Sequence, residues 1–317
     1  MIITDYLRSK PDITWQLALQ CGVKHGVIRL PEDDGFDLTD LSHIRAVTDR
    51  FLSHGITPLV VEPLPNALHD HIKLGDGLRD ESIEKFIKLM ANLRETSVNT
   101  VCFNFMAHYG WTRTATELPE RGGARVTGFK YSDFKPDGTE LSAKRLWENY
   151  EYFIKAVIPY AERYDIRLAL HPDDPPLSSL GGVARIFTSL EAIKKGISVV
   201  ESDNLGVTFC QACYYLMGEN VELAARELAK KIFFIHFRNV RGDKTNFSET
   251  FHDNGELDMA RLMRVYEKEG INVPIRVDHV PTLAGEDIGV AGYDALGRLF
   301  AIGYLKGIID GNGVCDD

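Results

Sequence analysis

The sequence predicts an α/β protein built as a (β/α)8 barrel. Short apolar runs alternate with longer amphipathic ones along the whole chain, a pattern typical of strands and helices in a parallel sheet. Eight such pairs can be followed, and the length of 317 residues suits one barrel of this kind. We therefore expect residues 1–317 to form a single domain.

The expected strands are short, and most of them end at a proline or a polar residue. They are residues 2–4, 27–30, 57–61, 100–105, 166–170, 205–209, 232–235 and 274–277. Each is followed by a segment with helical periodicity. These segments are residues 14–21, 39–53, 82–93, 141–163, 183–195, 221–229, 258–269 and 293–309. Gly22 directly follows the first and Gly55 lies two residues after the second, as glycines at helix C-termini often do.

Two segments between these elements show no helical or strand period. Residues 64–77 are expected to be a loop, and this loop carries His69, His71 and Lys73. Residues 106–138 form the longest irregular segment, rich in glycine, arginine, threonine and aromatic residues. Loops of that length inside compact domains are usually functional, so we expect residues 106–138 to be an active-site lid.

Composition excludes several classes of protein. The formal net charge of −10 argues against binding to nucleic acid or to an anionic membrane, since both need a positive face. No apolar run reaches the about 18 residues of a membrane-spanning helix, and the N-terminus lacks the pattern of a signal peptide. The cysteine count of 5 is odd and the cysteines are scattered, which is typical of reduced thiols. We therefore expect a cytoplasmic protein.

Four consecutive strands end in side chains that can bind a metal ion. His171 follows the fifth strand, Cys210 the sixth, His236 the seventh and Asp278 the eighth. The carboxyl ends of the strands of a barrel meet on one face, where the active sites of this fold are built. The sequence therefore predicts that these four side chains converge on one site.

The chemistry of this set favours a catalytic transition metal. Imidazole, thiolate and carboxylate together suit Mn(II), Fe(II), Co(II) or Zn(II) better than Mg(II) or Ca(II), which prefer oxygen ligands. A structural zinc site with the same four ligands is the alternative. Structural zinc ligands usually cluster in short loops, whereas these are spread from residue 171 to residue 278.

The remaining histidines and cysteines are less informative. Cys210 and Cys213 form a C-x-x-C pattern, but nothing else suggests a redox protein, and we expect Cys213 to be a packed thiol. His252 lies in an acidic loop and is expected at the surface. For His69 and His71, binding and solvated-loop interpretations are about equally favoured.

Several longer motifs, taken together, resemble those of the D-mannonate dehydratases in order and spacing. Those around the strand ends are His171-Pro-Asp-Asp-Pro-Pro, Phe209-Cys210-Gln211, His236-Phe-Arg-Asn239 and Val277-Asp278-His279. The others are Ile72-Lys-Leu-Gly75, Cys102-Phe-Asn-Phe-Met106, Trp111-Thr-Arg-Thr114, Asp253-Asn-Gly-Glu-Leu-Asp-Met259 and Gly292-Tyr293. The resemblance covers the chain from about the third strand to the C-terminus.

The resemblance implies a xylose-isomerase-like barrel that converts D-mannonate to 2-keto-3-deoxy-D-gluconate and water with Mn(II) or Fe(II). It implies that His171, Cys210, His236 and Asp278 are the metal ligands. It also implies that His279 and Tyr293 are the proton-transfer pair. Members of the superfamily are often dimers or tetramers, so a homo-oligomer is expected.

Binding of the small sugar-acid substrate is expected from polar side chains near the strand ends. The candidates are Arg238, Asn239, Lys73, Arg113 and Asp173. For each, a polar contact within the barrel wall or at the surface is nearly as well favoured. The two carboxylates after His171 are expected to support the ligands or to bind substrate hydroxyls.

This chain departs from the family pattern at the eighth strand. The family usually has Arg-Pro-Asp-His-Gly-Arg there, and this chain has Arg276-Val-Asp-His-Val-Pro281. The loss of the last arginine bears on which acid is recognised. Two other functions are therefore kept open: a metal-dependent sugar isomerase or epimerase of the same barrel type, and a sugar-acid-binding barrel that has lost its activity.

Overall fold

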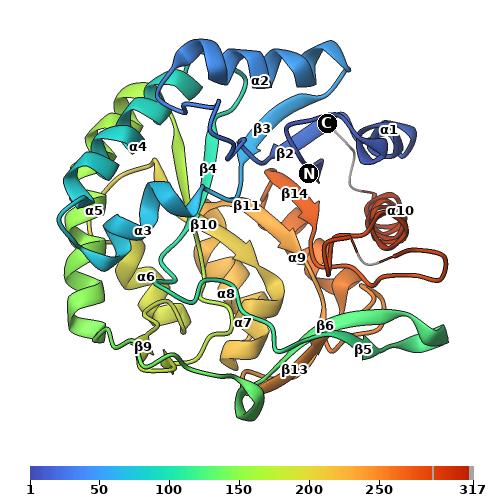
Figure 1. Cartoon of the computed structure of the whole chain (residues 1–317). Helices are drawn as coiled ribbons and strands as arrows, with labels where there is room; N and C mark the ends of the chain where they lie inside the picture. The colour runs from blue at the N-terminus through green and yellow to red at the C-terminus, as the bar shows by residue number, and fades with distance from the viewer. Residues whose placement is uncertain (288, 314–317) are drawn as a thin grey trace.

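The computed structural model describes residues 1–287 and 289–313, and within them eight parallel strands close into a barrel. Their order around the barrel is β1-β14-β11-β10-β7-β4-β3-β2 (Figure 1). The strands are β1 (Ile2–Leu7), β2 (His25–Ile28), β3 (Thr57–Val61), β4 (Thr100–Asn104), β7 (Arg167–His171), β10 (Leu205–Cys210), β11 (Ile232–Phe237) and β14 (Pro274–Val277). The predicted (β/α)8 fold is confirmed.

Helices surround the barrel on its outer side (Figure 1). They are α1 (Ile13–Gln20), α2 (Leu41–Ser53), α3 (Asn66–Leu74), α4 (Arg79–Leu93), α5 (Ala143–Tyr164), α6 (Leu190–Ile197), α7 (Gln211–Met217), α8 (Val221–Leu228), α9 (Met259–Lys268) and α10 (Ala295–Asn312). Several begin at a side chain that accepts a hydrogen bond from a backbone N–H of the first turn. Asp12, Ser142 and Asp258 are examples, and such caps define where each helix starts.

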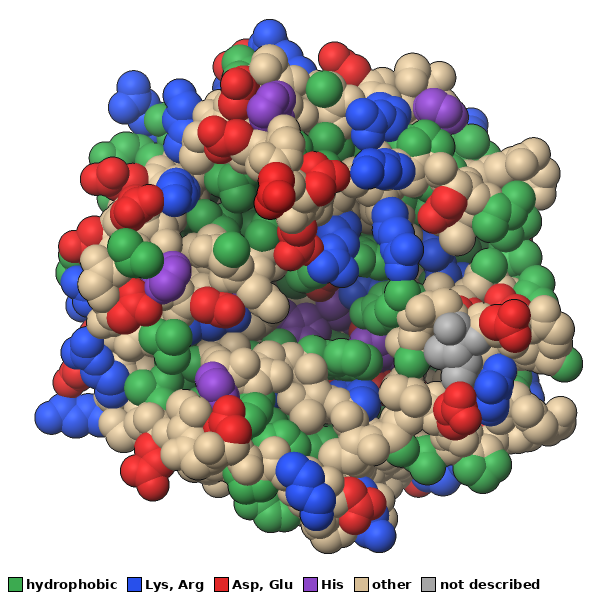
Figure 2. All heavy atoms as spheres, viewed as in Figure 1, with side chains coloured by type: hydrophobic (Ala, Val, Ile, Leu, Met, Phe, Trp, Pro, Cys, Tyr) green, Lys and Arg blue, Asp and Glu red, His purple; other side chains and the backbone are tan. Residues whose placement is uncertain are grey.

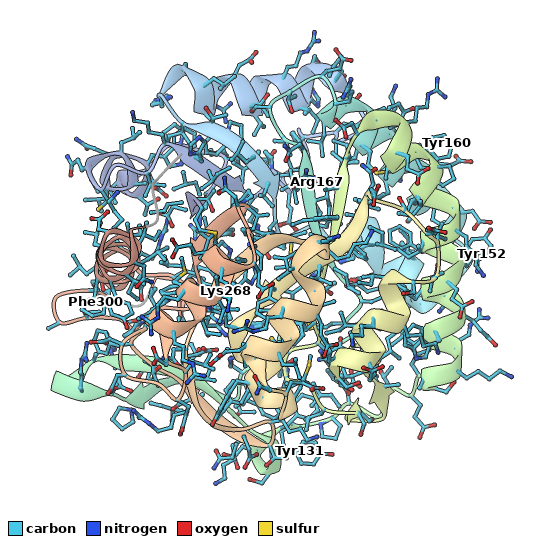
Figure 3. All side chains as sticks on the ribbon, turned by 180° about the vertical axis from the view of Figure 1, so that it is seen from behind. Tyr131, Tyr152, Tyr160, Arg167, Lys268 and Phe300 are labelled. Atoms are coloured by element: carbon cyan, nitrogen blue, oxygen red, sulfur yellow. The ribbon has the colours of Figure 1, made fainter. Side chains whose placement is uncertain are left out.

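The core has two parts, as the barrel fold requires. Inside the barrel, small and large apolar side chains from several strands pack together: Val27, Val60, Cys102, Ala169, Phe233 and Phe234. A larger cluster fills the space between the strands and the helices. Figure 3 shows the face at the N-terminal ends of the strands, with Arg167 at the start of β7 near its centre. His171, at the other end of β7, therefore belongs to the opposite face.

A second, antiparallel sheet stands beside the barrel mouth. It has the order β12-β13-β6-β5 and consists of β12 (Val240–Asp243), β13 (Asn246–Glu249), β6 (Arg125–Lys130) and β5 (Ala115–Pro119). Residues 106–138 are thus not irregular as expected, because β5 and β6 form a hairpin that pairs with the hairpin after β11. The expectation failed because this pairing joins segments more than 100 residues apart, which no local pattern reveals.

Two further expectations were wrong in detail. Residues 64–77 contain the helix α3, which ends at Gly75 with φ +65°. The helix expected at residues 183–195 begins only at Leu190, after the cap Ser189. Val183–Ala184 instead forms β9, which pairs with β8 (Ser179–Leu180) across two glycines of positive φ.

In the part of the chain that the structure describes, no helix is both long enough and apolar enough to cross a lipid bilayer.

Candidate active site

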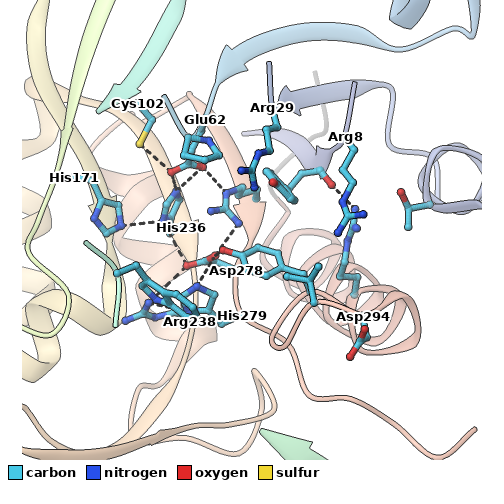
Figure 4. Close-up of a pocket in the computed structure, with 18 of the residues that line it drawn as sticks. Arg8, Arg29, Glu62, Cys102, His171, His236, Arg238, Asp278, His279 and Asp294 are labelled. Atoms are coloured by element: carbon cyan, nitrogen blue, oxygen red, sulfur yellow. Dashed lines mark hydrogen bonds and ion pairs between the residues drawn. The ribbon is translucent and has the colours of Figure 1, made fainter. Parts of the chain in front are cut away.

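Three of the predicted metal ligands meet at the C-terminal mouth of the barrel. His171 and Cys210 are the last residues of β7 and β10, and His236 is the last but one of β11. One ligand atom of each lies within 4.8 Å of the other two. Because the strands are parallel neighbours, their ends bring these side chains together although up to 65 residues of chain separate them (Figure 4).

Asp278 stands next to this group, directly after β14. Its Oδ2 lies 3.5 Å from Nδ1 of His236. Burial alone would raise the pKa of the Asp278 carboxyl, but Arg276 and the neighbouring imidazoles hold that pKa well below its usual value. Arg276 Nη1 donates to Asp278 Oδ1 over 2.7 Å. The carboxylate is therefore ionised, as a metal ligand must be.

The hydrogen bonds of the two histidines to neighbouring groups leave the second nitrogen of each ring directed toward the other histidine. Nδ1 of His171 lies 2.6 Å from the carbonyl oxygen of Pro172, so it carries the proton and donates it. Nε2 of His236 lies 3.0 Å from a Glu62 carboxylate oxygen and donates there. The remaining nitrogens, Nε2 of His171 and Nδ1 of His236, face each other at 3.2 Å. Without a metal ion, a proton between these two nitrogens keeps their lone pairs from facing each other, and a metal ion can take the place of that proton.

The surroundings of His236 favour a positive charge at this point. Burial and Arg276 lower the pKa of His236, but Glu62, Asp278 and Cys210 outweigh them and raise it to about 9. A group that attracts a proton so strongly also attracts a metal cation. The donor set therefore fits a divalent ion, and we regard the facing nitrogens as the clearest sign of this fit.

Cys210 is the thiol of this group and lies at the N-terminus of α7. Burial raises the pKa of the Cys210 thiol, but the hydrogen bond from Cys213, Arg238 and the two histidines together hold it well below its usual value. The pKa of Cys213 is raised by burial and by Cys210. Cys213 is buried and stays a thiol, which agrees with the expected packed cysteine.

Glu62 is a member of the site that the sequence did not reveal. It follows β3 directly and joins three neighbours: His236, Arg276 and Cys102. Arg276 Nε donates to Glu62 over 2.8 Å, and the Cys102 thiol donates over 2.9 Å. A carboxylate that accepts the second N–H of a metal-binding histidine fixes its tautomer and ring orientation. Glu62 therefore turns Nδ1 of His236 toward His171 and Asp278.

The predicted proton-transfer pair lies on the other side of Asp278. The rings of His279 and Tyr293 have centroids 5.4 Å apart, and the Tyr293 hydroxyl lies 3.4 Å from Asp278 Oδ1. His279 has φ +43°, a left-handed conformation that is uncommon outside glycine. Burial and Asp278 raise the pKa of Tyr293, so its hydroxyl keeps its proton.

The tautomer of His279 follows from its neighbours. Nδ1 lies 3.0 Å from Glu249 Oε1 and 2.9 Å from Arg238 Nη1. Arginine can only donate and a carboxylate can only accept, so Nδ1 can satisfy just one of them. Burial would raise the pKa of Glu249, but Arg238 and Arg113 hold it below its usual value. Because Arg238 Nη1 already donates to Asp174, we assign the proton to Nδ1 of His279, which donates to Glu249. Nε2 of His279 then faces the cavity side, 3.6 Å from Asp278 Oδ1, and is available for proton transfer.

Behind His279 lies a buried network of ion pairs. Arg113 donates to both oxygens of Asp174, over 2.8 and 3.0 Å, and to Glu249. Arg238 Nη1 donates to Asp174 over 2.7 Å. Arg113 comes from the segment before β5 and Glu249 from β13, so the network ties the antiparallel sheet to the barrel mouth.

Most of these groups line one cavity of about 480 Å³, whereas Cys210, Arg113 and Glu249 lie behind its wall. Figure 2 looks into this hollow, with histidine side chains on its floor and basic side chains along one rim. We call His171, His236, Asp278 and Glu62 the metal end of the cavity. The wall formed by β1, β2 and the start of α1 contributes Arg8, Asp12, Thr14 and Arg29, which we call the distal end (Figure 4).

Comparison with known proteins identifies the family. The D-mannonate dehydratase (UxuA) family model matches residues 6–141 and 136–313. The chain belongs to the D-mannonate dehydratase family. A mannonate dehydratase of Oceanobacillus iheyensis is 32% identical over 320 residues, covering 91% of this chain and 90% of that protein. One of Streptococcus agalactiae is 32% identical over 300 residues, covering 84% and 85%.

Solved structures agree with this family. The crystal structure of a mannonate dehydratase from Streptococcus suis serotype 2 has a TM-score of 0.90 at 27% identity, covering 98% of this chain and 93% of that one. A xylose isomerase domain protein from Planctomyces limnophilus has a TM-score of 0.65 at 13% identity, covering 99% of each chain. The second likeness shows the shared fold: a xylose-isomerase-like barrel. Mannonate dehydratases are hydro-lyases, so the chain belongs to an enzyme family.

Only one of the five residues expected to bind substrate lines the cavity. Arg238 lines the cavity, whereas Lys73, Arg113, Asn239 and Asp173 are not among the lining residues. Asn239 holds the loop after β11 through hydrogen bonds to the His252 and Leu257 carbonyls. Lys73 is buried near Asp70, and Asp173 accepts from the backbone N–H of Phe187 over 2.7 Å. In this structure these side chains support the walls of the site.

One expectation about the other histidines was wrong. His252 is buried, stacks on the ring of Phe237 and lies 2.7 Å from the Phe237 carbonyl oxygen through Nε2. The acidic residues around it in the sequence suggested a surface loop, but its ring packs against Phe237 of β11. His69 is buried on α3, and the half-buried His71 pairs with Asp76; neither lines the cavity.

The cavity residues that the sequence analysis missed share one position: each directly follows a barrel strand. Glu62 follows β3, Arg29 follows β2 and Arg8 follows β1. All three stand at the same edge of the barrel as the predicted ligands. Extending the strand-end argument to the third strand would have found Glu62. It would not have found Arg8 or Arg29, because the first strand was expected to end at residue 4 and the second to include residue 29.

Proposed function

We propose that this protein is a metal-dependent sugar-acid dehydratase that converts D-mannonate to 2-keto-3-deoxy-D-gluconate and water. One observation carries the proposal beyond family membership. His171, His236 and the pair His279 and Tyr293 line a single cavity around Asp278, with Cys210 beside the two ligand histidines. A dehydration that begins next to a carboxylate needs charge stabilisation and two proton transfers, and this cavity offers groups for both.

Mn(II) or Fe(II) is the proposed cofactor, held by His171, Cys210, His236 and Asp278. A thiolate among the ligands disfavours Mg(II) and Ca(II). When bound, such an ion supplies Lewis-acid stabilisation of the negative charge that develops on the substrate carboxylate as the C2 proton leaves. The charge of Arg276, shared between Glu62 and Asp278, keeps these ligands and their support ionised and ordered.

His279 and Tyr293 are proposed to move the two protons. One group takes the proton from C2, and the other donates a proton to the C3 hydroxyl as it leaves as water. His279 Nε2 is free for this role because Nδ1–H is held by Glu249. The Tyr293 hydroxyl is protonated and faces the same carboxylate, Asp278. Arg238 is the proposed substrate-binding residue that lines the cavity.

The other substrate-binding candidates are proposed to act through their neighbours. Arg113 holds Asp174 and Glu249 and thereby orients Arg238 and His279. Asp173, Asn239 and Lys73 stabilise the backbone segments that surround the site. A homo-oligomer, a dimer or tetramer, and a cytoplasmic location remain predictions, and light scattering of the purified protein measures the former.

The test is an assay of D-mannonate with detection of the 2-keto product. We expect product with the Mn(II)-loaded protein, no product after chelation, and recovery when Mn(II) is added back. Absence of turnover of any aldonate, with metal bound, would falsify the proposal. Exchange of the C2 proton with solvent deuterium without loss of water would instead indicate an isomerase or epimerase. Tight aldonate binding without turnover, unaffected by His279→Asn, would indicate a binding protein.

A further inference from the structure

The cavity extends well beyond the groups that carry out the proposed reaction. Its metal end is formed by β7, β11 and β14, and its distal end by β1, β2 and the first residues of α1. Cavities of about 300–1,000 Å³ typically hold drug-sized ligands, which are larger than a six-carbon acid. At about 480 Å³, this cavity has room for a group beyond the reacting end of the substrate.

At the metal end, every charged side chain of the described residues has a partner of opposite charge. Arg276 is shared by Glu62 and Asp278, and Arg238 pairs with Asp174. Arg298, which also lines the cavity, is held by Asp5. These guanidinium groups are therefore already neutralised and have little capacity left for a further anion.

Arg8 at the distal end is different. Among the residues that the structure describes, its side chain has no ion pair and no hydrogen bond. Arg29, from the next strand, shares a single carboxylate, Glu32, whose side chain is 40% exposed. Figure 4 shows both guanidinium groups directed into the cavity from the β1 and β2 side. Arg8 thus offers free N–H donors to this space, and Arg29, after the adjacent strand, adds those not engaged by Glu32 and Tyr6.

The two carboxylates at this end, those of Asp12 and Asp294, lie at the N-termini of helices and accept other hydrogen bonds. Asp12 is the N-cap of α1, where its Oδ1 accepts from the backbone N–H and the hydroxyl of Thr14. Asp294 is the N-cap of α10 and accepts from the hydroxyl of Thr282 and the N–H of Gly289. The positive end of a helix stabilises such carboxylates. Among the described residues, neither carboxylate forms an ion pair with Arg8.

From this arrangement we infer that the distal end is a subsite for a second anionic group. D-mannonate, whose sixth carbon carries a neutral hydroxyl, would leave this subsite without an anion, so the inference extends the substrate class to sugar acids with a second anionic group at the far end of the carbon chain. That group is the second carboxylate of an aldarate or a phosphate ester. Guanidinium groups bind both, through paired N–H donors. The inference rests on the proposed function, which it makes more specific.

The test compares three probes by calorimetry on the Mn(II)-loaded full-length protein: D-mannonate, D-mannarate and 6-phospho-D-mannonate. We expect at least one of the two doubly charged probes to bind about tenfold more tightly than D-mannonate. The probe that binds more tightly than D-mannonate shows whether the subsite prefers a carboxylate or a phosphate. Equal affinity for all three probes would overturn the inference.

Substitutions then locate the preference. In the double variant Arg8→Gln/Arg29→Gln, the affinity ratio of doubly to singly charged probe should fall to about one. The matched control is Lys10→Gln, which removes a nearby cation that pairs with Asp33 outside the cavity and should leave the ratio as it is in the wild type. A preference that persists in the double variant contradicts the inference.

Failure of this inference and failure of the proposed function give different results. Turnover of D-mannonate without a preference for doubly charged probes leaves the dehydratase proposal intact and removes the subsite. A preference that depends on Arg8 and Arg29, without turnover of any probe, retains the subsite and removes the dehydratase proposal. Circular dichroism of each variant verifies folding, which the exposed positions of both arginines favour.

Discussion

The two ends of the cavity use charge in opposite ways. At the metal end, carboxylates, imidazoles and guanidinium groups are buried and hold one another in place. At the distal end, the arginines are exposed, and Arg8 has no partner among the described side chains. The first arrangement fixes the positions of reacting groups, whereas the second leaves donors free for a ligand. Removal of one charge should therefore have a large effect at the metal end and a selective effect at the distal end.

The largest effect is expected for a ligand. Cys210→Ser replaces the thiolate by a weaker donor and should lower the affinity for Mn(II) by more than about 100-fold, with loss of turnover. Competition with a coloured chelator measures this affinity. The matched control is Cys21→Ser, a half-buried thiol outside the cavity. If both variants retain wild-type affinity, Cys210 is not a ligand.

The next largest effect is expected on the free energy of unfolding, when a buried ion pair behind the site is broken. Arg113→Gln leaves Asp174 and Glu249 with Arg238 as their remaining cation, and should destabilise the fold by about 3–5 kcal/mol. Arg94→Gln breaks an exposed pair with Asp165 and should cost less than about 1 kcal/mol. Urea unfolding compares the two. Equal losses would mean that the buried network does not hold the site together.

The carboxylate that orients His236 gives a smaller effect. Glu62→Gln keeps the shape but weakens the hydrogen bond to Nε2, and should lower the affinity for Mn(II) about 10–100-fold. Glu32→Gln, at the distal end, serves as the control because it lies outside the metal end. The Co(II)-substituted protein adds a spectroscopic readout, since a reoriented imidazole changes the visible absorption. An unchanged affinity and spectrum would exclude the orienting role.

The smallest expected effect is on how the free energy of unfolding depends on pH. Burial lowers the pKa of His252 to about 4, despite the hydrogen bond to Phe237. In the unfolded chain the pKa of His252 is near 6.5, so unfolding binds a proton below this pH and the folded state loses stability as the pH falls toward 4. Above pH 6.5 His252 is neutral in both states and this loss is absent. Between pH 7 and pH 5 the wild type should lose about 2 kcal/mol more than His252→Gln. Chemical unfolding at both pH values measures this, and the exposed His54→Gln should behave like the wild type.

The barrel could be read from the sequence because its strands are local apolar runs. Thr57–Val61 and Pro274–Val277 have the predicted bounds, and the four predicted ligands lie at four consecutive strand ends. The antiparallel sheet could not be read, since β6 and β13 pair across more than 100 residues. Glu62 was missed because a glutamate before a proline indicates only the end of a strand. Glu249 belongs to β13, a strand that the sequence did not predict.

Trp111 makes occupancy of the site detectable by fluorescence. It is 40% exposed, and its ring lies 5.0 Å from that of His279 at the cavity wall. Of the 3 tryptophans of the chain, Trp15 is buried against Phe51 and Trp147 packs on Phe187. A ligand that enters the cavity displaces water from Trp111 and leaves the other two in place. The protein therefore carries a fluorescent reporter of its own, which registers occupancy before any product forms.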